Sequence, residues 1–446
     1  DEQGAPSLAP DALEALEPEA DMVLGQQNFT IGTANRGSGS VSATGFDLPA
    51  GLAFDGAGNL YVADFNNLRV LRFAAPLGAE SAANAVYGQA SLTARELPPQ
   101  ASARTIFGPT AVGVDGGNVY VAAPADNRIL VFAADGPPGS PAREILGQPD
   151  FTLTRPNPGS FPFASATTFA SPNDIEIDPD GNLVVSDSGN NRVLSFPRGG
   201  KSATRVWGQV DFRANGANRV KPGSINSPYK VVIDYSQSPY ALYVSDLNNH
   251  RVLGWRDSVR FRTGDPADLV IGQPDFDSAA PNVDSRAMAN PTATSLFAPR
   301  GLALDVDGNL YVADSGNNRV LRYPRPVTQT GRITPDLVLG QTDFTTAVSA
   351  GVSASSMNAP AGLAVDPNGD LFVADSGNHR VLQFPRGSVN GAAAIRVIGQ
   401  PGFITGVSPS VPSVQTLSSP QGIAVDASYT LFVADAGSNR VLVFPN

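Results

Sequence analysis

The chain has 446 residues, of which 41% are apolar, and a formal net charge of −11 at pH 7. It contains no cysteine and two histidines, which excludes disulfides, thiolate nucleophiles and a three-histidine metal site. No uninterrupted apolar run is long enough to span a membrane, and the acidic balance disfavours a protein that grips nucleic-acid phosphates.

The first segment, residues 1–21, carries acidic residues and no basic one. Acidic, Ala- and Pro-rich stretches of this kind rarely bury enough apolar surface to fold. We therefore expect an acidic flexible leader over residues 1–21 and a single domain over residues 22–446. The start at Asp1 rather than Met, together with the lack of cysteine, favours an exported protein, extracellular or periplasmic.

From residue 22 onward one pattern recurs seven times at a period of about 60 residues, which indicates a copied supersecondary unit. Each copy ends in an arginine within an Asn-Arg-Val-Leu-like phrase. These arginines are Arg69, Arg128, Arg192, Arg251, Arg319, Arg380 and Arg440. A Gly-Gln phrase opens each copy, and its glycines are Gly25, Gly88, Gly147, Gly208, Gly272, Gly340 and Gly399.

Within the clearest copy, residues 302–304, 310–313 and 319–321 alternate between apolar and other residues, which is typical of β-strands. Turn-forming residues at 305–309 and 315–318 separate these strands, and a fourth strand is predicted over 337–341. The chain opens with a fourth strand at 22–26 that lacks its first three, and closes with three strands between 422 and 444 that lack a fourth. The sequence thus predicts an all-β, seven-bladed β-propeller of four-stranded antiparallel blades, closed by pairing of the N-terminal strand with the last three C-terminal strands.

The phrases Val-Ala-Asp-Ser-Gly-Asn-His-Arg-Val-Leu at 373–382 and Val-Ser-Asp-Leu-Asn-Asn-His-Arg-Val-Leu at 244–253 resemble the NHL repeat. The resemblance covers essentially the whole chain after residue 21 and implies the same propeller fold. Proteins of the NHL family serve as docking platforms for protein and RNA, as extracellular sensor domains and, in a few cases, as lyases or hydrolases. The resemblance therefore leaves the function open.

Residues repeated in every copy are expected to build the blade. The aspartate that ends each first strand, such as Asp305, should accept backbone N–H groups in the following turn. The aspartate that ends each second strand, such as Asp314, should pair with the arginine five residues later. The second copy has Ala123 in that place, which predicts an under-partnered Arg128. The two histidines, His250 and His379, share one repeat position and are expected to be loop residues rather than catalysts.

Function is better sought where one copy departs from the others. The connections from fourth to first strands are long and lie on one face of the predicted ring, where binding sites commonly occur. Residues at the rim of the central channel are mostly small, but blades 3 to 5 carry a polar set: Asn173, Asp174, Glu176, Tyr229, Lys230 and Arg300. The loop before Lys230 adds three cations, Arg213, Arg219 and Lys221. We expect these residues to form a polar, locally basic recess, with an internal salt-bridge network as the alternative.

The leading hypothesis is an exported, non-catalytic recognition or scaffold propeller that binds a small anionic ligand or a protein partner at this recess, with no cofactor and no nucleic acid. The rival is a hydrolase or lyase, similar to propeller lactonases. In that case Asp174 and Glu176 would be the acid and base, Lys230 and Arg300 would stabilise negative charge, and a calcium or magnesium ion could take part. The oligomeric state is left open.

Overall fold

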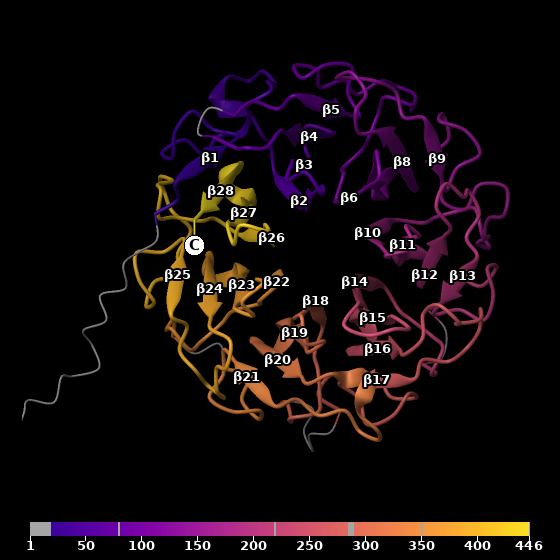
Figure 1. Cartoon of the computed structure of the whole chain (residues 1–446), viewed down its shortest axis with the longest axis vertical. Coiled ribbons are helices and arrows are strands. Elements are labelled where there is room, and N and C mark those ends of the chain that lie inside the picture. The colour runs from indigo at the N-terminus through magenta and orange to yellow at the C-terminus, as the bar shows by residue number, and fades with distance from the viewer. Residues whose placement is uncertain (1–18, 79–80, 218–219, 284–289, 349–350, 446) are drawn as a thin grey trace, which may run out of the picture.

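The computed structural model describes residues 19–78, 81–217, 220–283, 290–348 and 351–445. Seven four-stranded antiparallel sheets stand around a central axis, with their first strands innermost and their fourth strands at the outer rim (Figure 1). The described residues contain no α-helix. The predicted seven-bladed, all-β propeller is confirmed.

Blade 1 comprises β2 (Pro49–Phe54), β3 (Leu60–Asp64), β4 (Arg69–Phe73) and β5 (Ala85–Tyr87). Blade 2 comprises β6 (Ala111–Asp115), β7 (Asn118–Ala123), β8 (Arg128–Ala133) and β9 (Glu144–Leu146). Blade 3 comprises β10 (Pro172–Ile177), β11 (Leu183–Asp187), β12 (Arg192–Phe196) and β13 (Arg205–Trp207). Blade 4 comprises β14 (Pro228–Asp234), β15 (Ala241–Asp246), β16 (Arg251–Trp255) and β17 (Leu269–Ile271).

Blade 5 comprises β18 (Pro299–Leu304), β19 (Leu310–Asp314), β20 (Arg319–Tyr323) and β21 (Leu337–Leu339). Blade 6 comprises β22 (Leu363–Val365), β23 (Leu371–Asp375), β24 (Arg380–Phe384) and β25 (Arg396–Ile398). Blade 7 comprises β26 (Pro420–Val425), β27 (Leu431–Asp435), β28 (Arg440–Phe444) and β1 (Met22–Leu24). Short 3-10 turns are η1 (Ala34–Gly37), η2 (Pro124–Asp126), η3 (Ser188–Asn190), η4 (Leu247–Asn249), η5 (Ser315–Asn317), η6 (Pro326–Thr328), η7 (Ser376–Asn378) and η8 (Ala436–Ser438).

The ring closes through β1, which completes blade 7 by pairing with β28, with Met22 opposite Val443. The expected closure is confirmed. Ala20 and Asp21 also donate backbone hydrogen bonds to the carbonyls of Val414 and Val443. The last residues of the predicted leader are thus bound to the propeller, and residues 1–18 lie outside the described part of the chain.

Each blade packs on both faces, because successive side chains of a strand point to opposite sides of the sheet. In β3, Leu60 and Val62 join a core with blade 7, whereas Tyr61 and Ala63 join a core with blade 2. A strand between two neighbours therefore needs apolar residues at nearly every position. This requirement explains the continuous apolar runs of the repeat.

The repeated arginines anchor the long loops. In blade 3, the buried Arg192 donates from Nε to Asp187 at 2.8 Å and from Nη1 to the Phe212 carbonyl at 2.7 Å. Its Nη2 donates to the carbonyls of Ser165 and Thr168. One guanidinium thus binds the loop before its own blade and the loop after it. The predicted Asp–Arg pair is confirmed in six blades, namely 1 and 3 to 7.

Blade 2 corrects one expectation. Arg128 does have a carboxylate partner, because Asp126 in η2 lies 3.1 Å from its Nη2 and replaces the aspartate lost at Ala123. Asp126 replaces the missing aspartate only in part, because the buried Nε of Arg128 has no hydrogen-bond partner among the described residues. The sequence prediction missed Asp126 because this residue approaches from inside the turn rather than from the end of β7.

The other repeated residues are structural, as expected. Asp305 accepts the N–H groups of Asp307 and Asn309 in its turn. His250 has a positive φ of 53°, and its Nδ1 accepts the N–H of Ala298 in the next blade. Blade 5 has asparagine at the same repeat position, where Oδ1 of Asn318 accepts the N–H of Ala359. The histidines are therefore interchangeable with asparagine as inter-blade caps.

Candidate ligand site in the channel mouth

The inner ends of the first strands line a cavity of about 450 Å³ at the central axis. This cavity is on the long-loop face, because the lining residues belong to the starts of the first strands. Four rim positions are glycine, and a Cβ at Gly301 would stand 2.1 Å from the carbonyl oxygen of Ala361 in the next blade. Gly51, Gly362 and Gly422 have the same close approach. The blades meet here backbone to backbone, so no side chain larger than hydrogen fits.

Blades 2 to 4 join differently, through polar side chains. Thr110 donates from Oγ1 to the carbonyl of Asn173 at 3.0 Å. Nδ2 of Asn173 lies 3.4 Å from the carbonyl of Tyr229, to which it donates. Oδ2 of Asp174 accepts the N–H of Val231 at 3.0 Å. Asn173 and Asp174 thus help to hold the ring together where the glycine contact is missing.

The charged residues of the cavity are Asp174, Glu176 and Lys230. Nζ of Lys230 lies 3.1 Å from Oδ1 of Asp174, and the two side chains are 32% and 13% exposed. Burial lowers the pKa of Lys230, but Asp174 and Glu176 outweigh that effect and raise the pKa overall. This ammonium group therefore stays protonated at physiological pH.

Glu176 has no comparable partner. Burial raises its pKa to about 7, with Lys230 opposing the rise and Asp174 adding to it. Within the described part of the chain, no group donates a hydrogen bond to its carboxylate. Glu176 is therefore a carboxyl group that titrates near neutral pH and faces the cavity with its oxygens available.

The structure brings together five of the predicted site residues: Asn173, Asp174, Glu176, Tyr229 and Lys230. Arg300 is exposed beside the mouth and is not among the residues that line the cavity. Arg213 lies in an outer loop, with its guanidinium 5.5 Å from the ring centroid of Phe163. Lys221 lines a separate groove of about 480 Å³, and Arg219 lies outside the described residues.

The cavity is therefore not the basic recess that the sequence suggested. Two carboxyl groups and one ammonium group line it. The net charge of the lining is therefore zero when Glu176 is protonated and negative when Glu176 is ionised. Closeness in sequence to Lys230 misled the prediction, because Arg213 contacts Phe163 and Lys221 lines a separate groove.

Sequence reasoning also missed Tyr235, which follows β14. Its hydroxyl donates to the carbonyl of Ile177 at 3.1 Å, and its ring packs edge-on against Tyr240. Burial raises the pKa of Tyr235, and the charge of Glu176 adds to the rise. The available signal was a departure from the repeat, since Tyr-Ser-Gln-Ser-Pro-Tyr at 235–240 replaces the usual Asp-Gly turn.

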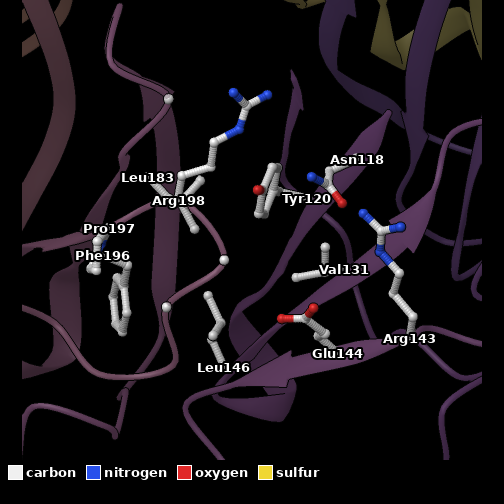
Figure 2. Close-up of a pocket in the computed structure, with 13 residues that line it drawn as sticks. Asn118, Tyr120, Val131, Arg143, Glu144, Leu146, Leu183, Phe196, Pro197 and Arg198 are labelled. Carbon is white, nitrogen blue, oxygen red and sulfur yellow. The ribbon is translucent and has the colours of Figure 1, made fainter. Parts of the chain in front are cut away.

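A second, smaller cavity of about 150 Å³ lies between blades 2 and 3, on the face of the short turns (Figure 2). Tyr120, Arg143 and Glu144 project into it, and Arg198 borders it from blade 3. Arg198 pairs with Asp115 at 3.2 Å. A volume of about 150 Å³ is too small for a ligand of ordinary size, so the channel mouth is the stronger candidate.

No three His, Cys, Asp or Glu side chains in the described ranges gather closely enough to hold a metal ion. The described residues also contain no helix that is long and apolar enough to cross a bilayer.

Comparison with known proteins agrees with the repeat pattern. The model of the NHL repeat matches residues 46–73, 169–196, 298–323 and 357–384. Blades 1, 3, 5 and 6 of the propeller thus match the NHL repeat. No curated protein matches the sequence of this propeller.

Solved structures that resemble this propeller include both enzymes and non-enzymes. Virginiamycin B lyase from Staphylococcus aureus superposes with a TM-score of 0.52 at 15% identity, over 91% of this chain and 98% of that one. A streptogramin B lyase reaches 0.54 at 12% identity, over 91% and 96%. The WD40 β-propeller domain of Doa1 reaches 0.54 at 9% identity, over 94% and 97%. At such identities the similarity shows the fold alone.

Proposed function

We propose that this propeller is a non-catalytic recognition protein that binds its ligand at the channel mouth on the long-loop face. The observation that carries the proposal is the carboxylate of Glu176, which faces a cavity of about 450 Å³ without a hydrogen-bond donor from the described residues. A carboxylate in such surroundings is costly unless a ligand or water supplies the missing donors.

The charges of the cavity indicate the chemistry of the ligand. Lys230 is paired with Asp174, so Glu176 is the charged group of the cavity that lacks an ion-pair partner among the described residues. An ammonium or guanidinium group, on a small molecule or on a side chain of a partner protein, would satisfy Glu176 and add a favourable charge interaction. This differs from the anionic ligand suggested by the sequence, which counted Arg300, Arg213, Arg219 and Lys221 together with Lys230 as cations of the recess.

The scaffold suits recognition because its site is rigid. The first strands are tied to one another by the Gly301-type contacts and by Asp174, and the long loops are held by buried arginines such as Arg192. Preorganised groups lose little entropy on binding. An extracellular or periplasmic location remains part of this proposal.

The test is calorimetric titration of arginine, lysine amide and spermidine into the wild type, Glu176→Gln and a surface control, Asp180→Asn. At pH 8 at least one amine should bind the wild type and the control equally, and Glu176→Gln should bind about tenfold more weakly. If no amine binds the wild type, or if Glu176→Gln binds as well as the wild type, the proposal is wrong.

A second candidate function is a lyase or hydrolase reaction with Glu176 as general base. A pKa of about 7 is suited to proton abstraction at neutral pH, and that value favours this alternative. A calcium or magnesium form fits less well, because Lys230 already occupies Oδ1 of Asp174 at 3.1 Å. Turnover of lactone or cyclic ester substrates that Glu176→Gln abolishes, with the fold intact, would establish the enzyme in place of the binding protein.

A further inference from the structure

A pocket of about 550 Å³ lies on the long-loop face of blade 7, apart from the channel. Its walls come from two distant parts of the chain, residues 30–36 and residues 408–438. Six of the thirteen lining residues bear hydroxyls, namely Thr30, Thr33, Ser408, Ser410, Ser418 and Ser438. Ile31, Pro409, Val411 and Pro412 form the apolar part of the lining. Arg36 is the charged residue of the lining, and no acidic residue contributes to it.

Arg36 is held in place by its neighbour. Asn35 exchanges two hydrogen bonds with Asn67, at 3.1 and 2.7 Å, and both Asn35 and Arg36 have positive φ, at 52° and 61°. Non-glycine residues adopt this conformation at a cost unless the surroundings impose it. The backbone is therefore fixed so that the Arg36 side chain borders the pocket.

The guanidinium of Arg36 is not neutralised. Its Nη1 donates to Oγ1 of Thr44, and its buried Nε has no partner in the described part of the chain. No carboxylate among the described residues forms an ion pair with it. Asp435, whose Oδ1 accepts the N–H of Ser418, is fully buried and is itself paired with Arg440 at 2.8 Å.

Further donors face the same space. The hydroxyls of Thr30 and Ser438 are engaged by Asn28 and Asp435. Ser408 and Ser418 share one hydrogen bond at 3.0 Å, whereas the hydroxyls of Thr33 and Ser410 make none with described residues. A guanidinium that lies among hydroxyls and has no ion-pair partner is complementary to an oxyanion.

We infer that this pocket binds an oxyanion, such as phosphate, sulfate or carboxylate, carried by a small polar ligand, with Arg36 as the anchoring cation. The site is independent of the channel proposal, and neither depends on the other. Because its two walls come from the start and the end of the propeller, a bound ligand links the segments that close the ring. Binding should therefore stabilise the fold in proportion to ligand concentration.

The test measures the melting temperature and calorimetric binding with sodium phosphate, sulfate and acetate, against sodium chloride at equal ionic strength. The variants are Arg36→Gln, Arg36→Lys and Thr33→Val, and Arg104→Gln is the matched control, an exposed arginine of another long loop. Thr33→Val keeps the side-chain shape and removes a hydroxyl. The ranking of the three anions identifies the group that is recognised.

We expect saturable binding of at least one anion and a melting temperature that rises with it. Arg36→Gln should weaken binding about tenfold or more, Arg36→Lys and Thr33→Val several-fold, and Arg104→Gln should bind as the wild type does. If Arg36→Gln fails to fold, weaker anion binding by Arg36→Lys and Thr33→Val tests the inference instead. The inference is wrong if the wild type binds none of the anions up to about 10 mM, or if all pocket variants bind equally well.

Discussion

Lys230 and Asp174 form an ion pair across the junction of blades 3 and 4, with Nζ and Oδ1 3.1 Å apart. The other carboxylate oxygen of Asp174 accepts the N–H of Val231 at 3.0 Å. The pair therefore serves the architecture of the ring as well as the cavity. Because it neutralises the lysine of the lining, Glu176 is left as the charged lining residue without an ion-pair partner among the described residues.

The Asp174–Lys230 pair should contribute measurably to stability. A double-mutant cycle with Asp174→Asn and Lys230→Met is expected to give a coupling of about 0.5–2 kcal/mol, because the pair is half-buried rather than fully exposed. Urea denaturation of the four proteins measures it. A coupling that cannot be distinguished from zero would show that water screens the pair.

Glu176 should make stability fall as the pH rises. Its pKa is about 7 in the folded protein against an ordinary value of 4.5, so the folded state binds more protons than the unfolded state between these two pH values. Unfolding free energy therefore decreases across this window. The loss from this residue should be about 1–3 kcal/mol between pH 4.5 and 8.

Glu176→Gln removes that titration and should flatten the dependence, so that the variant becomes more stable than the wild type at pH 8. Urea denaturation at several pH values, with Asp180→Asn as a surface control, measures the difference. Parallel profiles for wild type and Glu176→Gln would contradict the assignment of a raised pKa to Glu176.

Blade 2 should tolerate loss of its carboxylate better than blade 3. Asp187 accepts three hydrogen bonds, from Nε of Arg192, the N–H of Ala170 and Nδ2 of Asn190. Asp126 accepts two, from Nη2 of Arg128 and the N–H of Phe107. Asp187→Asn should cost about 3–5 kcal/mol and Asp126→Asn at least about 1 kcal/mol less. Equal losses, measured by thermal or urea unfolding, would show that the replacement in blade 2 is complete.

Strand β1 should be essential for ring closure. A chain that begins at Thr30 lacks the partner of β28, the Phe29 carbonyl that accepts from Arg440, and the buried Val23 and Leu24. The two apolar residues alone contribute about 1.5–3 kcal/mol each. The shortened chain should unfold at lower urea and aggregate through the open edge of β28, whereas a chain that begins at Glu19 should unfold as the full chain does. Light scattering and urea titration separate the two outcomes.

The repeat made the fold predictable. Alternation within the strands and turn residues between them are local signals, and seven copies reinforce one another until the blade, its Asp–Arg pair and the closure by β1 can be read directly. Departures from the repeat also located the channel residues Asp174, Glu176 and Lys230, because a position that faces the axis in one blade faces it in all.

What the sequence could not decide was where the irregular parts of the chain go. Arg213 and Lys221 precede Lys230 closely in sequence, yet Arg213 contacts Phe163 and Lys221 lines a separate groove, which leaves the cavity without the cations that were expected there. Asp126 reaches Arg128 from within a turn. Arg36 lines one pocket with Ser408 and Ser418 because residues near the two ends of the propeller close one blade. The repeat determines the strands of each blade and their Asp–Arg pairs. The charge of each pocket depends instead on tertiary contacts between segments that share no sequence pattern.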